Sequence, residues 1–403
     1  MRRPWIVLAS IVGIAAILSA VALAVEWQPI PRSGDGTASA GAADPDAANG
    51  PPRVAWAFAS MLPPEEANSF VLQAGFLGDE APRIDLDIPW AVDPNVDLGR
   101  TPAVSRPAAG SVAFVADDGV TSRLSLVPIA VGGEPRVLTE LDVAVWTVAL
   151  APDASAAYLA VSGRGGEMDG SIIRVALDGS GETEVLLPPA GEAARPRDAV
   201  PVAVATFHAV LDVSPDGRLL GAMVCRGAAG CTSTVIDLES GDRLELDDST
   251  LYRVGAGGLA IIDRCTPVAC LGEVLDVDSG ATAPLPGHAS EASLASVGGR
   301  PVVVWVDFED PRGVLMMRDV AGGDRVELFR AGDRATIFLS SFSGLLWSVP
   351  NDAVLLLVND ERPGPAGATE VTERHLLVPL DGGAPIELPG PSYRPVGQPG
   401  AKG

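Results

Sequence analysis

The stretch that decides the fold is Leu211–Leu246, LDVSPDGRLLGAMVCRGAAGCTSTVIDLESGDRLEL. It alternates short apolar runs with turn signals. A Ser-Pro-Asp-Gly turn closes the first run, the Cys225–Cys231 segment closes the second, and Glu-Ser-Gly-Asp closes the third. Runs of about five residues separated by tight turns of this composition are typical of antiparallel strands. The stretch therefore predicts a four-stranded antiparallel meander.

A hairpin of one design recurs six times along the chain. Each copy has an apolar strand, a turn that contains glycine, and a second strand that ends in an apolar residue. The glycine supplies the positive φ of the turn, and a spacing of roughly 40–60 residues between copies lies in the range of a propeller blade. The copies are VPIAVGGEPRVL (127–138), VALDGSGETEVL (175–186), VIDLESGDRLEL (235–246), VLDVDSGATAPL (274–285), MRDVAGGDRVEL (317–328) and VPLDGGAPIEL (378–388).

Upstream of most hairpins lies a second repeated unit, in which a turn joins an apolar strand to a strongly apolar one. Near-continuous apolar runs suit strands that are covered on both faces, as the inner strands of stacked propeller blades are. The turns are at 151–154, 214–217, 255–258, 297–300 and 350–353, and the strands after them are AAYLAV, LLGAMV, LAIID, PVVVWV and AVLLLV.

The sequence VSPDGRLL at 213–220, with LAPD at 150–153 as a weaker copy, resembles the motif of TolB-like and WD-repeat-like β-propellers. The later Asp-x-x-Ser-Gly hairpins resemble the outer strands of such blades. The resemblance covers roughly residues 100–390. It implies a β-propeller but no particular activity, because such propellers serve as scaffolds, ligand binders and enzyme domains.

The number of blades stays open at six or seven. The segments RVAWAF, SFVLQAGF and RIDLDI, within residues 53–100, suit a seventh blade completed by the carboxyl-terminal segment around Ser392–Val396. They equally suit a lid over a six-bladed ring. The fold class that we expect is all-β, a β-propeller of six or seven four-stranded blades preceded by one N-terminal transmembrane helix.

The amino terminus predicts a membrane segment. An apolar run of 21 residues, Trp5–Val25, follows Arg2 and Arg3 and precedes Glu26. At a rise of 1.5 Å per residue, a helix of this length spans a hydrocarbon core of about 30 Å. The flanking charges place the body of the chain outside the cytoplasm. The alternative is a cleaved signal peptide, because Ala22–Ala24 matches a small-x-small cleavage site.

The chain therefore divides into four parts. Residues 1–27 are the membrane anchor or signal segment, and residues 28–52, rich in Pro, Gly, Ala, Ser and Asp, are a flexible linker. Residues 53–390 form the β-propeller and residues 391–403 a disordered tail. We expect a single-pass cell-membrane protein with the propeller on the extracytoplasmic side, secreted if the N-terminal segment is cleaved.

The composition bounds the choice of partner. The apolar content of 47% is ample for a core, and the formal net charge is −24. A charge of this sign argues against nucleic acid and against an anionic membrane surface as the main contact. The expected partners are an unidentified cell-envelope protein or ligand, and the membrane through the N-terminal helix.

The four cysteines predict two disulfides, Cys225–Cys231 and Cys265–Cys270. Each pair brackets the connection between the second and third strands of neighbouring blades, where hairpin partners are close enough for a bridge, and an exported protein meets an oxidising environment. Four cysteines allow three connectivities. A zinc site is the alternative, but the spacings are not those of zinc motifs and no histidine lies nearby. We expect no metal and no cofactor.

The candidate binding residues lie on one face of the propeller. In this fold the connections between second and third strands share a face with those between blades, and the longest inserts fall there. They are Gly163–Gly170, Asp307–Gly313 and Asp360–Arg374. Function concentrates on such loops, although ordinary solvated loops have the same composition. The candidates are Glu167, Asp169, Asp307, Glu309, Asp310, Arg312, Asp360, Glu361 and Arg362.

No catalytic motif is present in the sequence. It has no Gly-x-Ser-x-Gly elbow, no Walker loop and no His-Glu-x-x-His, and its three histidines, His208, His288 and His375, fall in separate blades. We name no catalytic residue. The expected function is that of a protein- or ligand-binding scaffold module. The alternatives are an exported hydrolase or lyase with its site at the central channel, and a sensor ectodomain.

Overall fold

The computed structural model describes most of the region expected to form the propeller. The described residues are 26–27, 54–61, 69–89, 103–162, 171–188, 207–226, 231–246, 249–265, 270–285, 289–339, 346–350, 352–363 and 369–388.

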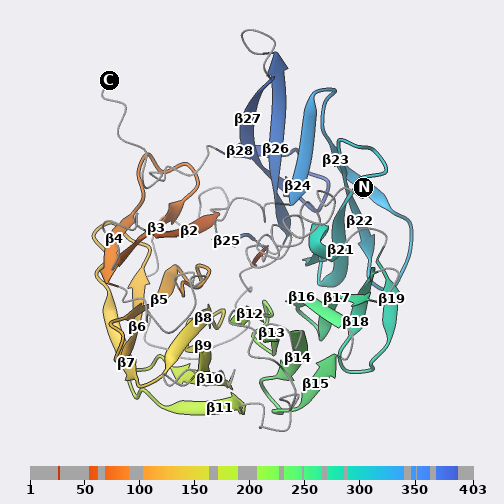
Figure 1. The fold of residues 1–403 in the computed structure, drawn as a ribbon. Coiled ribbons are helices and arrows are strands. Elements are labelled where there is room, and N and C mark those ends of the chain that lie inside the picture. The colour runs from red at the N-terminus through yellow and green to blue at the C-terminus, as the bar shows by residue number, and fades with distance from the viewer. Residues whose placement is uncertain are drawn as a thin grey trace, which may run out of the picture.

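Seven sheets built from these residues stand around one axis, each with its innermost strand towards the centre (Figure 1). We number them as blades 1–7 in chain order. The predicted all-β propeller is confirmed, with seven blades. Blade 1 contains β1 (Glu26–Trp27), β25 (Leu346–Ser348), β2 (Ala55–Met61), β3 (Ser69–Phe76) and β4 (Ile84–Pro89); blade 2 contains β5 (Ser111–Asp117), β6 (Ser122–Pro128) and β7 (Arg136–Leu141); blade 3 contains β8 (Ala144–Leu150), β9 (Ala156–Ser162), β10 (Ser171–Ala176) and β11 (Thr183–Leu187).

The remaining blades have four strands each. Blade 4 contains β12 (Phe207–Val213), β13 (Leu219–Arg226), β14 (Cys231–Asp237) and β15 (Arg243–Leu246); blade 5 contains β16 (Ser249–Gly255), β17 (Leu259–Cys265), β18 (Cys270–Asp276) and β19 (Thr282–Pro284); blade 6 contains β20 (Ala292–Val297), β21 (Arg300–Asp307), β22 (Val314–Asp319) and β23 (Val326–Arg330), with the 3₁₀ turn η5 (Ala289–Glu291) before it; blade 7 contains β24 (Ala335–Leu339), β26 (Ala353–Pro363), β27 (Thr369–Pro379) and β28 (Ile386–Leu388).

The six repeated hairpins are the outer hairpins of blades 2 to 7, as predicted. In blade 4, for example, β14 and β15 pair antiparallel, with Ile236 opposite Arg243, and Gly241 in the turn between them has a φ of 78°. The strongly apolar strands are second strands. All seven residues of β9 are buried, because a second strand has its own sheet on both sides and a neighbouring blade on each face.

The hydrophobic core lies between the blades. Alternate residues of one blade meet alternate residues of the next, so each strand contributes to two interfaces. Between blades 6 and 7, the facing residues include Val304, Leu315, Ile337, Leu356 and Val358, all fully buried.

The ring closes through a strand that the sequence does not reveal. β25 falls in the sequence between the first two strands of blade 7, yet it pairs antiparallel with β2 of blade 1, with Ala55 opposite Ser348. The expected closing segment, 392–396, lies outside the described residues. The turn at 350–353, expected to join two strands of one blade, instead joins β25 of blade 1 to β26 of blade 7.

The excursion is stabilised by packing at the seam between the last and first blades. Trp56 and Val54 of blade 1 form one buried cluster with Leu355 and Leu377 of blade 7. Trp56 is fully buried. At this seam β25 pairs with β2, which comes from the other end of the chain. The sequence pattern at 350–353 reflects only neighbours along the chain, and it therefore predicts the wrong pairing.

The backbone places the cysteines as the disulfide prediction requires. Cys225 stands opposite Cys231 across β13 and β14, and Cys265 stands opposite Cys270 across β17 and β18. Residues directly opposite each other in an antiparallel ladder have Cα atoms about 4.5–5.5 Å apart, within the range of a disulfide. The bonds themselves stay a prediction.

The expected N-terminal membrane helix, linker and disordered tail fall almost wholly outside the described residues. Within those residues, no helix has the length and apolar character that crossing a bilayer requires.

Candidate functional site

The hairpin of β26 and β27 extends above the ring (Figure 1). Each of these strands has eleven residues, whereas the other described strands have at most eight. The sequence explains where the buried part ends: the apolar run of Ala353–Val358 gives way to Asn-Asp-Glu-Arg-Pro. The apolar half packs in the ring, and the polar half carries charges beyond it.

The alternation of side chains along a strand places three charged residues, Asp360, Arg362 and Arg374, on one face of the hairpin. Val354, Leu356 and Val358 face blade 6, so Asp360 and Arg362 continue the same face of β26.

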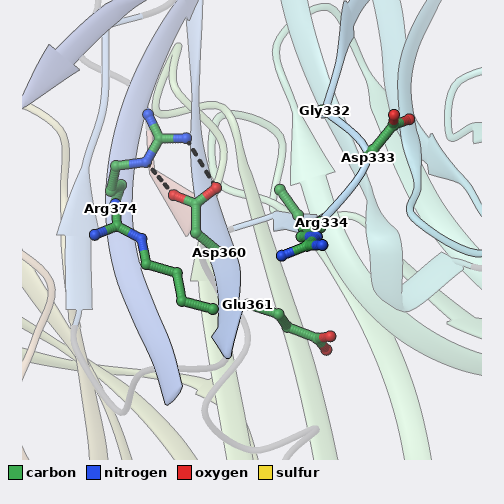
Figure 2. Close-up of a pocket in the computed structure, with 8 residues that line it drawn as sticks. Gly332, Asp333, Arg334, Asp360, Glu361 and Arg374 are labelled. Carbon is green, nitrogen blue, oxygen red and sulfur yellow. Dashed lines mark hydrogen bonds and ion pairs between the residues drawn. The ribbon is translucent and has the colours of Figure 1, made fainter. Parts of the chain in front are cut away.

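Arg374 joins them, because it stands opposite Val358 on β27. Its guanidinium holds the Asp360 carboxylate with two bonds: Nη2 donates to Oδ1 at 3.2 Å and Nε donates to Oδ2. A third bond runs from Nη1 to Glu387 Oε2 at 3.0 Å. Hydrogen bonding to Asp360 is the main cause that raises the pKa of Arg374. Figure 2 shows the Asp360–Arg374 pair at the edge of a pocket.

The second wall of this pocket is the connection from blade 6 to blade 7, residues 331–334. Glu361 N donates to the Arg334 carbonyl at 2.7 Å, which fixes the connection against β26. Arg312, in the loop between β21 and β22, donates to Asp333 Oδ1 at 2.8 Å. Two connections of the predicted face are therefore joined by one ion pair.

Gly313 permits the close approach of these two connections. Its φ is 78°, and a Cβ at this position would lie 2.8 Å from both Ile337 Cγ1 and Val306 Cγ1. The neighbouring Arg312 carbonyl accepts a hydrogen bond from Ile337 N at 3.0 Å. Blade 6 is thus tied directly to the first strand of blade 7 beneath the pocket.

The pocket is open and has a volume of about 460 Å³. Figure 2 shows labelled side chains from the connection and from both strands of the hairpin. Its charges balance, with three arginines and three acids. The lining residues are Gly332, Asp333, Arg334, Ala335, Asp360, Glu361, Arg362 and Arg374.

The structure brings part of the predicted binding set together. Asp360, Glu361 and Arg362 line the pocket, and Arg312 reaches it through Asp333. Glu167 and Asp169 lie outside the described residues.

Two other predicted residues shape their own loop. Asp307 Oδ1 accepts from Glu309 N at 2.9 Å, and Asp310 Oδ1 accepts from Arg312 N at 3.1 Å. Asp310 also binds Arg330 at 2.8 Å. Glu309, by contrast, is exposed. In the loop between β21 and β22, the acids that bind backbone are occupied in holding the turn, which leaves Glu309 as the one directed to solvent.

Sequence reasoning missed Arg334 and Asp333, and it left Arg374 out of the candidate set. The first two lie in the short sequence Ala-Gly-Asp-Arg between two strands, which was not among the long inserts. Its composition, two opposite charges after a glycine, was the available signal. Arg374 was inside a chosen insert, but its pairing with Asp360 depends on the register of the hairpin.

A second polar cluster lies near the axis of the ring. Arg106 lies between Val104 and Ala108, which pair with β5 at the inner edge of blade 2. Its Nη1 donates to Asp212 Oδ1 of blade 4 at 3.4 Å. Asp212 Oδ2 also accepts from Val254 N of blade 5 at 2.9 Å. Asp212 and Arg253 are buried, and desolvation is the main cause that raises the pKa of Asp212. Three blades therefore contribute polar groups to one buried cluster.

Metal ligation finds no support in these clusters. No group of three or more His, Cys, Asp or Glu side chains within the described part of the chain has the geometry to hold a metal ion.

Comparisons with known proteins show a likeness in fold. No protein-family model and no curated protein matches the sequence, whereas many solved structures match. TolB from Acinetobacter baumannii is 14% identical over 84% of this chain and 80% of its own, with a TM-score of 0.37. Oligogalacturonate lyase from Vibrio parahaemolyticus is 10% identical over 84% of this chain and 86% of its own, with a TM-score of 0.45.

A mutant of puromycin hydrolase complexed with PGG gives a TM-score of 0.50, at 15% identity over 93% of this chain. The match spans 58% of that enzyme, so part of it has no counterpart here. At such identities the likeness extends to the fold alone. The chain is a seven-bladed β-propeller.

Proposed function

We propose that this chain is an extracytoplasmic binding module, held at the membrane by residues 1–27, whose propeller binds a cell-envelope protein or ligand. The contact surface is the loop face, which we define by the connections 308–313 and 331–334 and by the polar ends of β26 and β27, residues 359–363 and 369–374. The observation that carries the proposal is the open pocket on this face, lined by Arg334, Arg362 and the Asp360–Arg374 pair.

The physical argument separates the two faces of the ring. Apart from the excursion of β25, the connections on the opposite face have two to seven residues and join neighbouring strands within one blade. The loop face has the longest hairpin and a pocket whose walls are fixed by backbone hydrogen bonds. A rigid scaffold that positions variable loops is the usual arrangement for recognition.

The test is a crosslinked pulldown of the full-length protein from its native membrane, with mass spectrometry of the partner and of the intact bait. We expect a reproducible envelope partner and a bait mass that includes residues 1–25. Charge reversal of two exposed acids of the loop face, Glu309→Arg with Glu361→Arg, should abolish capture.

The matched control reverses two exposed acids in outer-hairpin turns of the opposite face, Glu182→Arg with Glu239→Arg. Capture by the control should equal that of the wild type. Equal capture by all three proteins rules out the loop face, and a bait that begins near Val25 rules out the anchor.

The buried cluster near the axis favours a second candidate function, that of an exported hydrolase or lyase. Polar groups converging from several blades, as Arg106, Asp212 and Arg253 do, are what a site at the centre of a propeller needs. Screening with chromogenic esters, peptides and uronates tests it. The enzyme function is supported if the protein turns over one of these substrates and if Asp212→Asn, still folded, does not. Absence of turnover with all three substrate classes rules this candidate out.

A further inference from the structure

The arginines of the loop face differ in whether an acid neutralises them. Arg312 binds Asp333, Arg330 binds Asp310 and Glu327, and Arg374 binds Asp360 and Glu387. By contrast, the side chains of Arg334 and Arg362 make no hydrogen bond or ion pair with any residue that the structure describes, although both line the pocket.

With 52 acidic and 28 basic residues, acids are in excess, and most described arginines have a carboxylate partner. Two unneutralised guanidinium groups on the walls of one pocket mark a place where an anion is recognised, because the planar guanidinium binds an oxyanion through paired, charge-assisted hydrogen bonds.

The acids around the pocket set the charge of that anion. Asp333 and Asp360 are occupied by Arg312 and Arg374, and Glu361 has no such partner in the described part of the chain. With those two pairs neutral, Arg334, Arg362 and Glu361 leave one net positive charge on the pocket walls, which a group with one negative charge balances. A carboxylate carries one charge and fits the fork of an arginine.

Both arginines sit on backbone that is already fixed. The Arg334 carbonyl accepts from Glu361 N at 2.7 Å, and Ala335 stands opposite Asp360 in the ladder. Arg362 stands opposite Glu370 near the end of the hairpin. Arg334 directly precedes β24 and Arg362 lies on the neighbouring strand β26, so little backbone ordering is needed when a ligand binds.

We propose that Arg334 and Arg362 bind a carboxylate group of a peptide segment of the partner. This rests on the proposed function, since it names the group that the loop face recognises. The carboxylate comes either from the free end of a chain or from an acidic side chain, and the test distinguishes the two.

The test follows the arginine Nε–H resonances of the full-length protein by NMR during titration with three probes. N-acetylglycine carries a free terminal carboxylate, N-acetylglutamate α-amide carries a side-chain carboxylate, and N-acetylglycinamide carries neither. Sodium chloride of equal ionic strength controls for screening. Arg334→Gln and Arg362→Gln assign the two signals, and Arg243, an arginine of β15 outside the pocket, is the internal control.

We expect saturable shifts at Arg334 and Arg362 with a carboxylate probe, none at Arg243, and none with the neutral amide. The stronger of the two carboxylate responses identifies the source. In each single variant the remaining arginine should bind about tenfold more weakly, as expected when one charge-assisted interaction is lost. Carboxylate shifts at Arg334 and Arg362 no larger than at Arg243 overturn the proposal.

Partner capture separates this inference from the function on which it rests. If Glu309→Arg with Glu361→Arg abolishes capture while Arg334→Gln with Arg362→Gln leaves it unchanged, the loop face binds the partner by other groups and the carboxylate proposal is wrong. The control Arg243→Gln removes one positive charge elsewhere, so a loss of capture in it reports net charge only.

Discussion

Arg106 of blade 2 reaches Asp212 of blade 4, past the intervening blade, and the two side chains meet at 3.4 Å. Both are largely shielded from water, with side-chain exposures of 13% and 5%. Asp212 in turn accepts from Val254 N of blade 5 at 2.9 Å. One carboxylate thus connects three blades at the axis of the ring.

Asp212→Ala should destabilise the protein by about 3–5 kcal/mol, because it removes a buried carboxylate that accepts from Arg106 and from Val254 N. Chemical denaturation measures the loss. The double variant Arg106→Leu with Asp212→Leu should recover part of it, since no buried charge of this pair remains. A single variant as stable as the wild type contradicts the assignment.

Gly258→Ala should be more destabilising than Gly241→Ala. Both glycines have a φ of 78°, so both variants lose about 1–2 kcal/mol from the left-handed conformation. A Cβ at Gly258, however, would lie 2.8 Å from Asp278 Oδ2 and 3.3 Å from Arg218 Nη1. A Cβ at Gly241 would have no neighbouring atom within 4 Å.

The difference between the two melting curves therefore reports the contact between Arg218 of blade 4 and Asp278 of blade 5. Combining Gly258→Ala with Asp278→Ala should bring the loss closer to that of Gly241→Ala. Equal melting temperatures for the two single variants would show that the side chains give way freely.

Acidification should weaken the seam between blades 7 and 1 through His375. Burial lowers the pKa of this histidine to about 4, from an ordinary value of 6.5. The folded state thus favours the neutral ring. Its contribution to stability is fully present above pH 6.5 and is lost as the pH falls towards 4, where the loss reaches about 3 kcal/mol.

Urea unfolding of the wild type and of His375→Gln between about pH 7 and pH 3 measures this effect. The difference between their unfolding free energies should change steadily over that range and level off below pH 4. Parallel curves would show that His375 takes up its proton as readily in the folded protein as in the unfolded one.

The cysteine pairs should be oxidised in the exported protein. Alkylation without reductant is expected to add no label, and alkylation after reduction to add four, as read from the intact mass. Each bridge closes a short loop and should stabilise by about 2 kcal/mol in the chain-entropy model. Cys225→Ser with Cys231→Ser leaves the other pair as the internal reference. Labelling before reduction would contradict both bridges.

The strands and the four-stranded blade can be predicted from the sequence. Glycine turns, Pro-Asp turns and apolar runs are local signals, because a turn with positive φ and a strand buried on both faces each restrict the residues at their own positions. That is why the six outer hairpins and the all-β propeller followed from residues 211–246 and their repeats, and why Asp360, Glu361 and Arg362 were placed on one face.

The closure of the ring and the pairing of its charges depend on the tertiary structure. β25 joins blade 1 because its partners, such as Ala55 and Ala57, come from the other end of the chain, and no local pattern records so distant a neighbour. The ion pair between Arg106 and Asp212 forms because blades 2, 3 and 4 curve around one axis. Arg334 reaches the pocket because Gly313 lets blade 6 approach blade 7. Packing between blades sets these contacts, and packing is a property of the whole ring.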